Sequence, residues 1–185
     1  MIFAAIALAI APSASAEEEV AVPFPLQAEL LSKAAGYDKN LPARAGDKAH
    51  VVVLRKEGSA ESARAAAQIE RALTEKIKDI GGIPHDVTSA VYTTAAELAQ
   101  MCGARRLAVV YVTPGLAEDI DAIAKGLSDV DVLTVSAVAP HVAKGIVLGF
   151  ELVSGKLKLD VNLAQARRQH VAFSAELLQF ARVVE

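Results

Sequence analysis

Small and polar residues stand directly after two short apolar runs, at positions where a folded chain could do chemistry. The runs are 51–54 and 107–112, and the residues that follow them are Lys56, Gly58, Ser59, Thr113 and Gly115. If both runs form parallel strands of one sheet, these residues meet at its carboxyl edge, where open α/β sheets bind ligands. Helices that begin there expose backbone N–H groups that hold small anions. Ordinary helix capping explains the same residue types, and no glycine-rich phosphate loop is present, so the set is a candidate ligand crevice with capping as the simpler interpretation.

The histidines, the cysteine and the serines form no metal or catalytic pattern. None of His50, His85, His141 and His170 has a partner at i, i+4 spacing or a carboxylate in a ligand motif. Cys102 is the only cysteine, which excludes an internal disulfide and favours a buried, inert thiol over intermolecular pairing. The sequence also has no G-x-S-x-G nucleophile elbow. We therefore expect a protein that is not an enzyme and that needs no metal or cofactor.

The adjacent pair Arg167-Arg168 is the most prominent exposed basic feature that the pattern predicts. As cations at the end of a short helix, the two side chains would stabilise that helix by only a few tenths of a kcal/mol. Arginine is also enriched among the residues that anchor protein–protein interfaces. Both interpretations stay open, and Arg167 and Arg168 are the candidate contact for a protein partner.

The composition argues against a nucleic-acid-binding protein. The formal net charge is −3, and aromatic residues make up only 4% of the chain. Neutralising phosphates requires clustered lysine and arginine, and stacking on bases requires aromatic side chains. We therefore expect no nucleic-acid partner.

Residues 1–16 have the features of a secretory signal peptide. They are apolar and end in Ala14-Ser15-Ala16, the small-x-small pattern that precedes a cleavage site, although no basic residue comes before Lys33. The apolar run is shorter than the roughly 20 residues that span a bilayer, so no membrane span is expected after cleavage. The pattern predicts export to the periplasm, a mature N-terminus at Glu17, and a single domain over 17–185.

The rest of the chain alternates between strand and helix patterns. Strands are predicted at 51–54, 85–92, 107–112 and 130–135, followed by a hairpin of 146–153 and 156–163 around Ser154-Gly155. Helices are predicted at 26–36, 59–80, 94–102 and 113–127, then around 166–168, and finally from Ser174 to Val184, while 38–48 is predicted to be a polar loop. This order predicts a three-layer α/β domain with a mostly parallel sheet and a C-terminal antiparallel hairpin.

The C-terminal quarter resembles a known family. A lysine-bearing strand runs into VNLAQARRQ and then FSAELLQFARVV, and the matching positions are Asn162, Leu163, Ala166, Arg167, Arg168, Ser174, Leu177, Leu178, Ala181, Val183 and Val184. This pattern is similar to the C-terminal signature of the YfiR-like periplasmic family. The chain departs from the family in having no tryptophan and in lacking the paired cysteines of some members.

The resemblance implies a fold like one lobe of a periplasmic binding protein. It also implies a regulatory role in cyclic-di-GMP signalling, with a membrane-bound diguanylate cyclase as the protein partner. A homodimer formed through the outer edge of the hairpin is a further expectation, because exposed strand edges pair readily. The alternative function is that of a small-solute-binding protein or transport accessory that uses the crevice.

Overall fold

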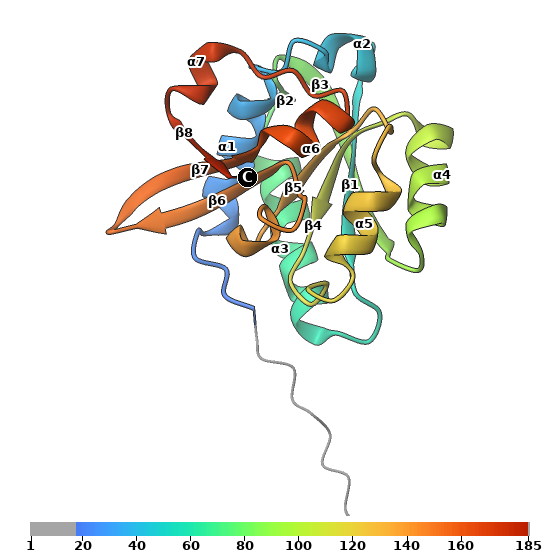
Figure 1. The fold of residues 1–185 in the computed structure, drawn as a ribbon. Coiled ribbons are helices and arrows are strands. Elements are labelled where there is room, and N and C mark those ends of the chain that lie inside the picture. Colours follow the sequence, from blue (N-terminus) through green and yellow to red (C-terminus); the bar gives the residue numbers. More distant parts are fainter. Residues whose placement is uncertain (1–17, 185) are drawn as a thin grey trace, which may run out of the picture.

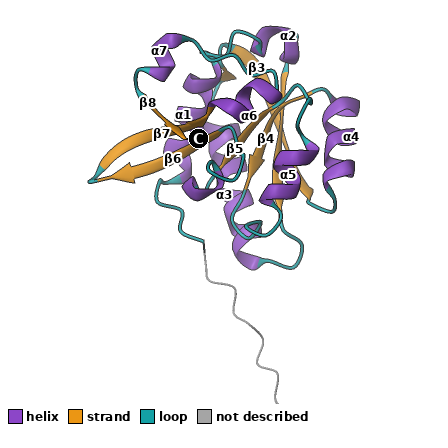
Figure 2. Ribbon diagram, in the orientation of Figure 1, coloured by secondary structure: helices purple, strands orange, loops and turns teal. Residues whose placement is uncertain are grey.

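The computed structural model describes residues 18–184, which form the predicted three-layer α/β domain (Figure 1). Eight strands in the order β2-β3-β1-β4-β5-β6-β7-β8 make one sheet, and helices cover both of its faces (Figure 2). The strands are β1 Ala49–Arg55, β2 Asp79–Ile80, β3 Ile83–Val91, β4 Leu107–Val112, β5 Leu133–Ser136, β6 Leu148–Val153, β7 Lys156–Asn162 and β8 Ala181–Val184. The helices are α1 Phe24–Ala35, α2 Leu41–Ala45, α3 Ala60–Lys76, α4 Ala95–Arg105, α5 Ile120–Gly126, the 3-10 turn η1 Ala139–His141, α6 Leu163–Arg168 and α7 Ala175–Leu178. The predicted signal peptide lies outside the described residues.

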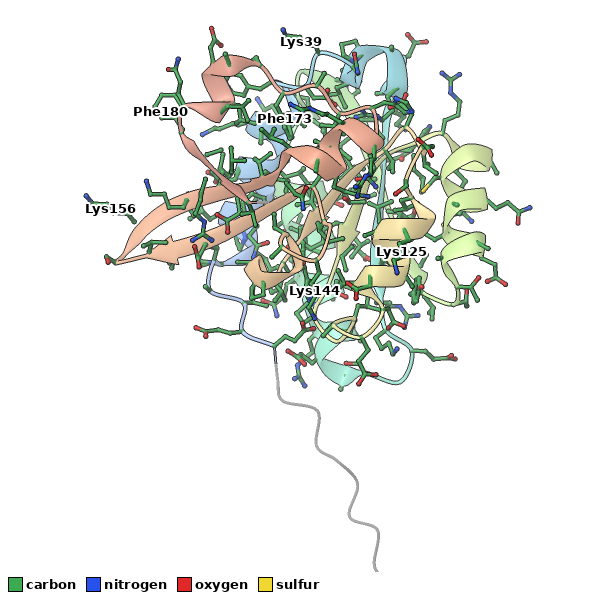
Figure 3. All side chains as sticks on the ribbon, in the orientation of Figure 1. Lys39, Lys125, Lys144, Lys156, Phe173 and Phe180 are labelled. Carbon is green, nitrogen blue, oxygen red and sulfur yellow. The ribbon has the colours of Figure 1, made fainter. Side chains whose placement is uncertain are left out.

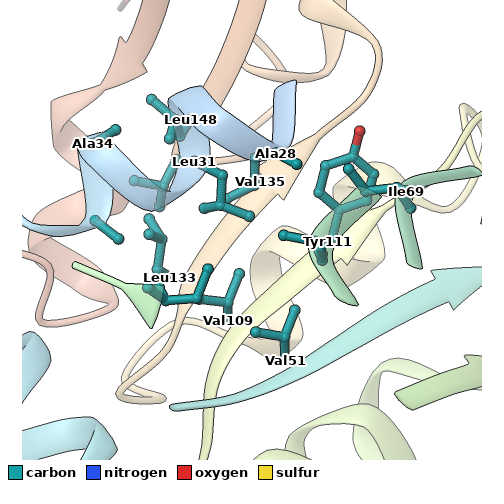
Figure 4. Close-up of a cluster of buried hydrophobic side chains, with 14 of the residues drawn as sticks. Ala28, Leu31, Ala34, Val51, Ile69, Val109, Tyr111, Leu133, Val135 and Leu148 are labelled. Carbon is teal, nitrogen blue, oxygen red and sulfur yellow. The ribbon is translucent and has the colours of Figure 1, made fainter. Parts of the chain in front are cut away.

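The central strand β4 divides the hydrophobic core between the two faces of the sheet. All of its residues are buried, as its unbroken apolar run predicts for a strand covered on both sides. Val109 and Tyr111 pack with α1 and α3 on one face, and Figure 4 shows Tyr111 beside Ile69 of α3. Val110 and Val112 pack with α4 and α5 on the other face. Because the neighbours of β4 run parallel to it, the loops that follow these strands gather at one edge.

The long helix predicted for 59–80 is shorter than expected. It ends at Lys76, and Ile80 belongs to β2, which pairs antiparallel with β3. Gly81-Gly82, predicted to stop the helix, form the hairpin turn with positive φ angles of 60° and 87°. The Gly81 N–H donates to the carbonyl of Ser32 in α1, so a contact with a distant helix stabilises the strand.

The predicted start of the next two helices was right in one case and wrong in the other. Thr94 caps α4, which continues past Gly103, its predicted end, to Arg105. Thr113-Pro114 do not begin a helix, because α5 begins only at Ile120. The Thr113 hydroxyl instead donates to the carbonyl of Leu54 on the neighbouring strand, at 2.8 Å. Residues 113–119 are therefore a turn-rich connection over the carboxyl edge.

The predicted hairpin is confirmed, but the last helix is largely a strand. β6 and β7 pair antiparallel, with Phe150 opposite Leu159. Asp160, predicted on the wet face of the hairpin, is buried. Beyond the four-residue α7, β8 pairs parallel with β7 along Leu159–Asn162. The hairpin edge predicted for dimer contact is therefore covered there by β8.

Candidate functional site

The structure brings the crevice residues together at the carboxyl edges of β1 and β4. A pocket of about 290 Å³ is lined by Lys56, Gly58, Ser59 and Gly115, while Thr113 lies buried beneath it. In Figure 1 the loops after these strands lie at the lower end of the domain, near the segment that precedes α1. The pocket is thus where the parallel-sheet rule predicts a ligand.

Hydrogen bonds among small polar side chains fix the floor of this pocket. Ser59 caps α3 by accepting from the Ser62 N–H at 3.1 Å. The Ser62 hydroxyl accepts from the Lys56 N–H at 2.8 Å and lies 2.7 Å from the Thr113 hydroxyl. These bonds join the loop after β1 to the loop after β4, and the capping interpretation of Ser59 holds.

The charged groups around the pocket are mostly acidic. The Lys56 ammonium lies 2.6 Å from Asp119, and this hydrogen bond raises the pKa of Lys56. Glu57, Glu61 and Glu118 line the same pocket. A dianion would meet repulsion at this rim, whereas a neutral or cationic group would not.

Glu18, which the sequence analysis did not single out, reaches into the crevice from the segment before α1. Its Oε2 accepts from the Gly115 N–H at 2.6 Å, and its Oε1 lies 2.5 Å from His141 Nε2. His141 Nδ1 in turn lies 2.8 Å from the Ser136 hydroxyl at the end of β5. No histidine has a carboxylate near it in a ligand motif of the sequence. Glu18 and His141 are far apart in the chain and are brought together only by folding. Burial lowers the pKa of His141, while the Glu18 carboxylate opposes that shift.

The row of contacting side chains Glu18, His141 and Ser136 does not make a hydrolytic site. Ser136 is 0% exposed, so a substrate has no access to its hydroxyl. The Ser136 Oγ also accepts from the Val138 N–H at 3.0 Å, which holds it in the backbone turn. The arrangement positions a histidine for binding a carboxylate and does not activate a nucleophile.

The predicted partner contact, Arg167 and Arg168, lies on α6 at the opposite edge of the sheet. Both side chains are exposed, and the Arg168 carbonyl accepts from the N–H of Asp129, which precedes β5. Arg168 lines a hollow of about 160 Å³ together with Lys125 and Lys144, which Figure 3 labels. The two candidate sites from the sequence are therefore separate surfaces.

An apolar groove, missed by the sequence analysis, lies between α1 and the C-terminal segment. It has a volume of about 550 Å³ and is lined in part by Leu30, Tyr37, Leu159, Leu177 and Phe180. The Phe180 side chain is 74% exposed and points away from the domain in Figure 3. The groove was not predicted, because the sequence pattern places Phe180 within a helix from Ser174 to Val184.

The part of the chain that is described shows neither a cluster of metal ligands nor an exposed cysteine. Within residues 18–184, no group of three or more His, Cys, Asp or Glu side chains could hold a metal ion. Cys102 is buried, and burial raises the pKa of its thiol to about 12. None of the helices among these residues is long and apolar enough to cross a membrane.

The fold is that of a periplasmic-binding-protein-like α/β domain, as comparison with solved structures shows. A conserved domain protein from Vibrio cholerae matches with a TM-score of 0.61 and 14% identity, over 88% of this chain and 60% of that one. The ABC domain from Streptococcus pneumoniae in complex with L-Trp matches with a TM-score of 0.60 and 11% identity, over 88% and 62%. CD0873, a substrate binding protein with adhesive properties from Clostridium difficile, matches with a TM-score of 0.53 and 14% identity, over 80% and 58%. The chain thus spans about 60% of the length of these structures.

The sequence comparison identifies the family. The YfiR/HmsC-like family model matches residues 25–182, nearly the whole described domain, and the chain belongs to this family. No curated protein matches the sequence. The resemblance seen in the C-terminal quarter is therefore confirmed, and it extends from α1 to β8.

Proposed function

We propose that this protein is an exported, non-enzymatic regulator that binds the periplasmic part of a membrane signalling enzyme, a diguanylate cyclase. Membership of the YfiR/HmsC-like family supports the regulatory role. The observation that carries the proposal is the apolar groove between α1 and α7, with Phe180 at its rim. An exposed aromatic side chain beside an apolar hollow is the usual anchor of a protein–protein contact.

The groove suits an apolar segment of a protein. Tyr37 is 39% exposed, and it lines the same groove as the more exposed Phe180. Aromatic side chains of this kind contribute large contact areas at low entropic cost. The Lys33 side chain lines the groove as well and offers a charged contact to the partner.

The Arg167-Arg168 pair is a second surface for the same partner. Its place on α6, away from the groove residues, requires a partner that extends around the C-terminal segment. Rim charges of this kind change association rate and salt dependence more than they change the lifetime of a complex. A homodimer in solution belongs to the same proposal, with β8 as the free strand edge.

The test combines partner capture with cyclase activity. Purified protein added to membranes that contain the cyclase should lower its activity, and Phe180→Ser should weaken that inhibition by about tenfold or more, as hot-spot truncation does. Val153→Ser is the control. Val153 is 40% exposed, like the groove residue Tyr37, but it lies on the face of the β6–β7 hairpin opposite to the face that carries the groove residue Leu159.

The basic pair has its own matched control. Arg167→Glu with Arg168→Glu should weaken capture of the cyclase in a salt-dependent manner, whereas Arg105→Glu with Arg106→Glu changes the charge equally on α4 and its C-cap. Each variant is first shown to be folded by circular dichroism. Unchanged inhibition by all of these variants, or no effect of the wild-type protein on the cyclase, would refute the proposal.

The alternative function, solute binding or transport accessory, rests on the crevice. The S. pneumoniae domain with a similar fold is described in complex with L-Trp. In this chain the Glu18 carboxylate occupies the crevice. Solute binding here therefore requires that Glu18 leave.

A further inference from the structure

The Glu18 side chain is held at the carboxyl edge in the way in which a carboxylate ligand is held. One oxygen accepts from a backbone N–H, that of Gly115 at 2.6 Å, and the other lies 2.5 Å from the ring of His141. The Glu18 side chain is 15% exposed and that of His141 is 2% exposed, so the contact is shielded from water. Charge-assisted hydrogen bonds are strong in such surroundings.

The groups that hold the carboxylate are fixed independently of Glu18. Gly115 adopts φ +89°, a conformation that favours glycine, and a Cβ there would lie 3.2 Å from the Ser59 hydroxyl. The His141 ring is held from behind by Ser136, whose Oγ accepts from the Val138 N–H. When the Ser136 hydroxyl donates to His141 Nδ1, the Nε2–H points at the carboxylate position.

Glu18 itself belongs to a short segment that is anchored elsewhere. Val22 is fully buried, and its carbonyl accepts from the Gln27 side chain at 2.7 Å. The Gln27 amide oxygen accepts from the Tyr111 hydroxyl at 2.5 Å. Val20 also packs against this core, so only Glu18 and the exposed Glu19 form a strap that would leave the crevice while Val22 stays in the core.

We propose that Gly115 and His141 form a binding site for a small carboxylate, and that the Glu18 side chain is its intramolecular occupant. A free ligand that displaces Glu18 places its carboxylate between the Gly115 N–H and the His141 Nε2–H. The remainder of the ligand faces Glu57 and Glu118, so it is neutral or carries an ammonium group, and a second carboxylate is rejected. This site is independent of the groove proposed for the protein partner.

Removing the occupant tests the site. An attached carboxylate competes at an effective concentration in the millimolar range or above, so Glu18→Ala should bind acetate and glycine at least about tenfold more tightly than the wild type. Succinate should bind more weakly than acetate because of the acidic rim. Glu19→Ala is the matched control, since Glu19 is the exposed neighbour on the same strap. The measurement is calorimetric titration of the exported protein, whose N-terminus is checked by mass spectrometry.

Nuclear magnetic resonance locates the binding site, and the second variant, Glu18→Gln, keeps the proposal testable if Glu18→Ala fails to fold. The Gly115 amide proton should move upfield in Glu18→Ala and should return when acetate is added. Glu18→Gln preserves the size of the side chain and should show a smaller upfield movement, because an amide oxygen is a weaker acceptor than a carboxylate.

Three results would each overturn the proposal. The first is equal affinity of the wild type and Glu18→Ala for acetate. The second is no binding by folded Glu18→Ala at concentrations well above the millimolar range. The third is an unmoved Gly115 amide signal in Glu18→Gln.

Discussion

Replacing Arg44, at the amino edge of the sheet, should strongly destabilise the protein. The segment 38–48 was predicted to be a polar loop, but it contains α2 and carries Arg44, whose side chain is 2% exposed. Its guanidinium contacts Asp38 and Asp131 at 2.7 Å each and the carbonyl of His170 at 3.3 Å. The Asp38 side chain is 0% exposed, so Arg44→Ala leaves a buried carboxylate without its cation.

Breaking a buried pair by removing one partner costs about 3–5 kcal/mol. Asp38 also accepts from the backbone N–H groups of Asn40 and Ala172 at 3.1 and 2.8 Å, which favours the lower end, about 3 kcal/mol. For a domain of this size, 1 kcal/mol lowers the melting temperature by about 2–4 °C, so Arg44→Ala should lower it by roughly 10 °C.

Chemical denaturation and calorimetry measure the change, with Asp131→Ala as the matched control. The Asp131 side chain is 50% exposed, so its loss should cost about 1 kcal/mol or less. Replacing Arg44 by methionine and Asp38 by asparagine together should cost less than Arg44→Ala, because no unpaired buried charge remains and the asparagine oxygen still accepts from the Asn40 and Ala172 N–H groups. Similar free energies of unfolding for Arg44→Ala and Asp131→Ala would refute the reasoning.

Three further predictions concern single side chains. The Cys102 thiol, whose pKa burial raises to about 12, should react with an aromatic disulfide at least about a hundredfold more slowly in the folded than in the unfolded protein, as followed by absorbance. Leu159→Asp, which places a carboxylate opposite Phe150, should cost about 2 kcal/mol in urea unfolding, while Lys156→Asp on the exposed hairpin end should change little. Burial and the positive charge of Lys144 lower the pKa of His141, and the Glu18 carboxylate opposes that shift without cancelling it. As the pH falls, His141 therefore takes up its proton in the unfolded chain before it does so in the folded protein. Stability should therefore be highest above about pH 6.5 and fall below it, more steeply in Glu18→Gln, and a flat pH profile in both proteins would contradict this.

The central strands were predictable because their burial leaves a direct trace in the sequence. β4 is covered on both faces, and only an unbroken apolar run satisfies that environment. The hairpin register followed from alternation, since Phe150 and Leu159 must share a face. The end of α3 was missed because Ile77 and Ile80 continue the helical spacing, while the strand is favoured by its pairing with β3 and by the bonds between α1 and β2.

The candidate site was predictable only in part. The crevice residues follow strands, so the parallel-sheet rule places them at one edge. The contact between Glu18 and His141 joins residues 123 positions apart, and no local pattern marks it. Within the acidic run that begins at Glu17, Glu18 has the sequence of a solvated tail. Its role follows from geometry alone.

The C-terminal segment connects the fold to the proposed partner surface through one ion pair. The apolar residues from Leu177 to Val184 have helical spacing, yet residues 181–184 form the strand β8. This strand pairs with the edge of β7, where it places Arg182 opposite the buried Asp160. Arg182 meets both Asp160 oxygens, at 2.9 and 2.7 Å, and also contacts Glu151 at 2.7 Å. Phe180 lies in the short connection between α7 and β8, so this ion pair fixes its place at the groove.

Arg182→Ala should therefore detach β8 without unfolding the domain. The Arg182 side chain is 51% exposed, so the expected cost is below that of a fully buried pair, about 2 kcal/mol. Backbone amides of 181–184 should lose protection in hydrogen exchange, while those of β4 keep theirs. Inhibition of the cyclase should weaken as it does in Phe180→Ser, and Arg182→Lys should restore part of it, because lysine supplies the charge without the two-point contact. Full protection of β8 in Arg182→Ala would show that backbone pairing with β7 alone holds the strand, and the groove would then be independent of the ion pair.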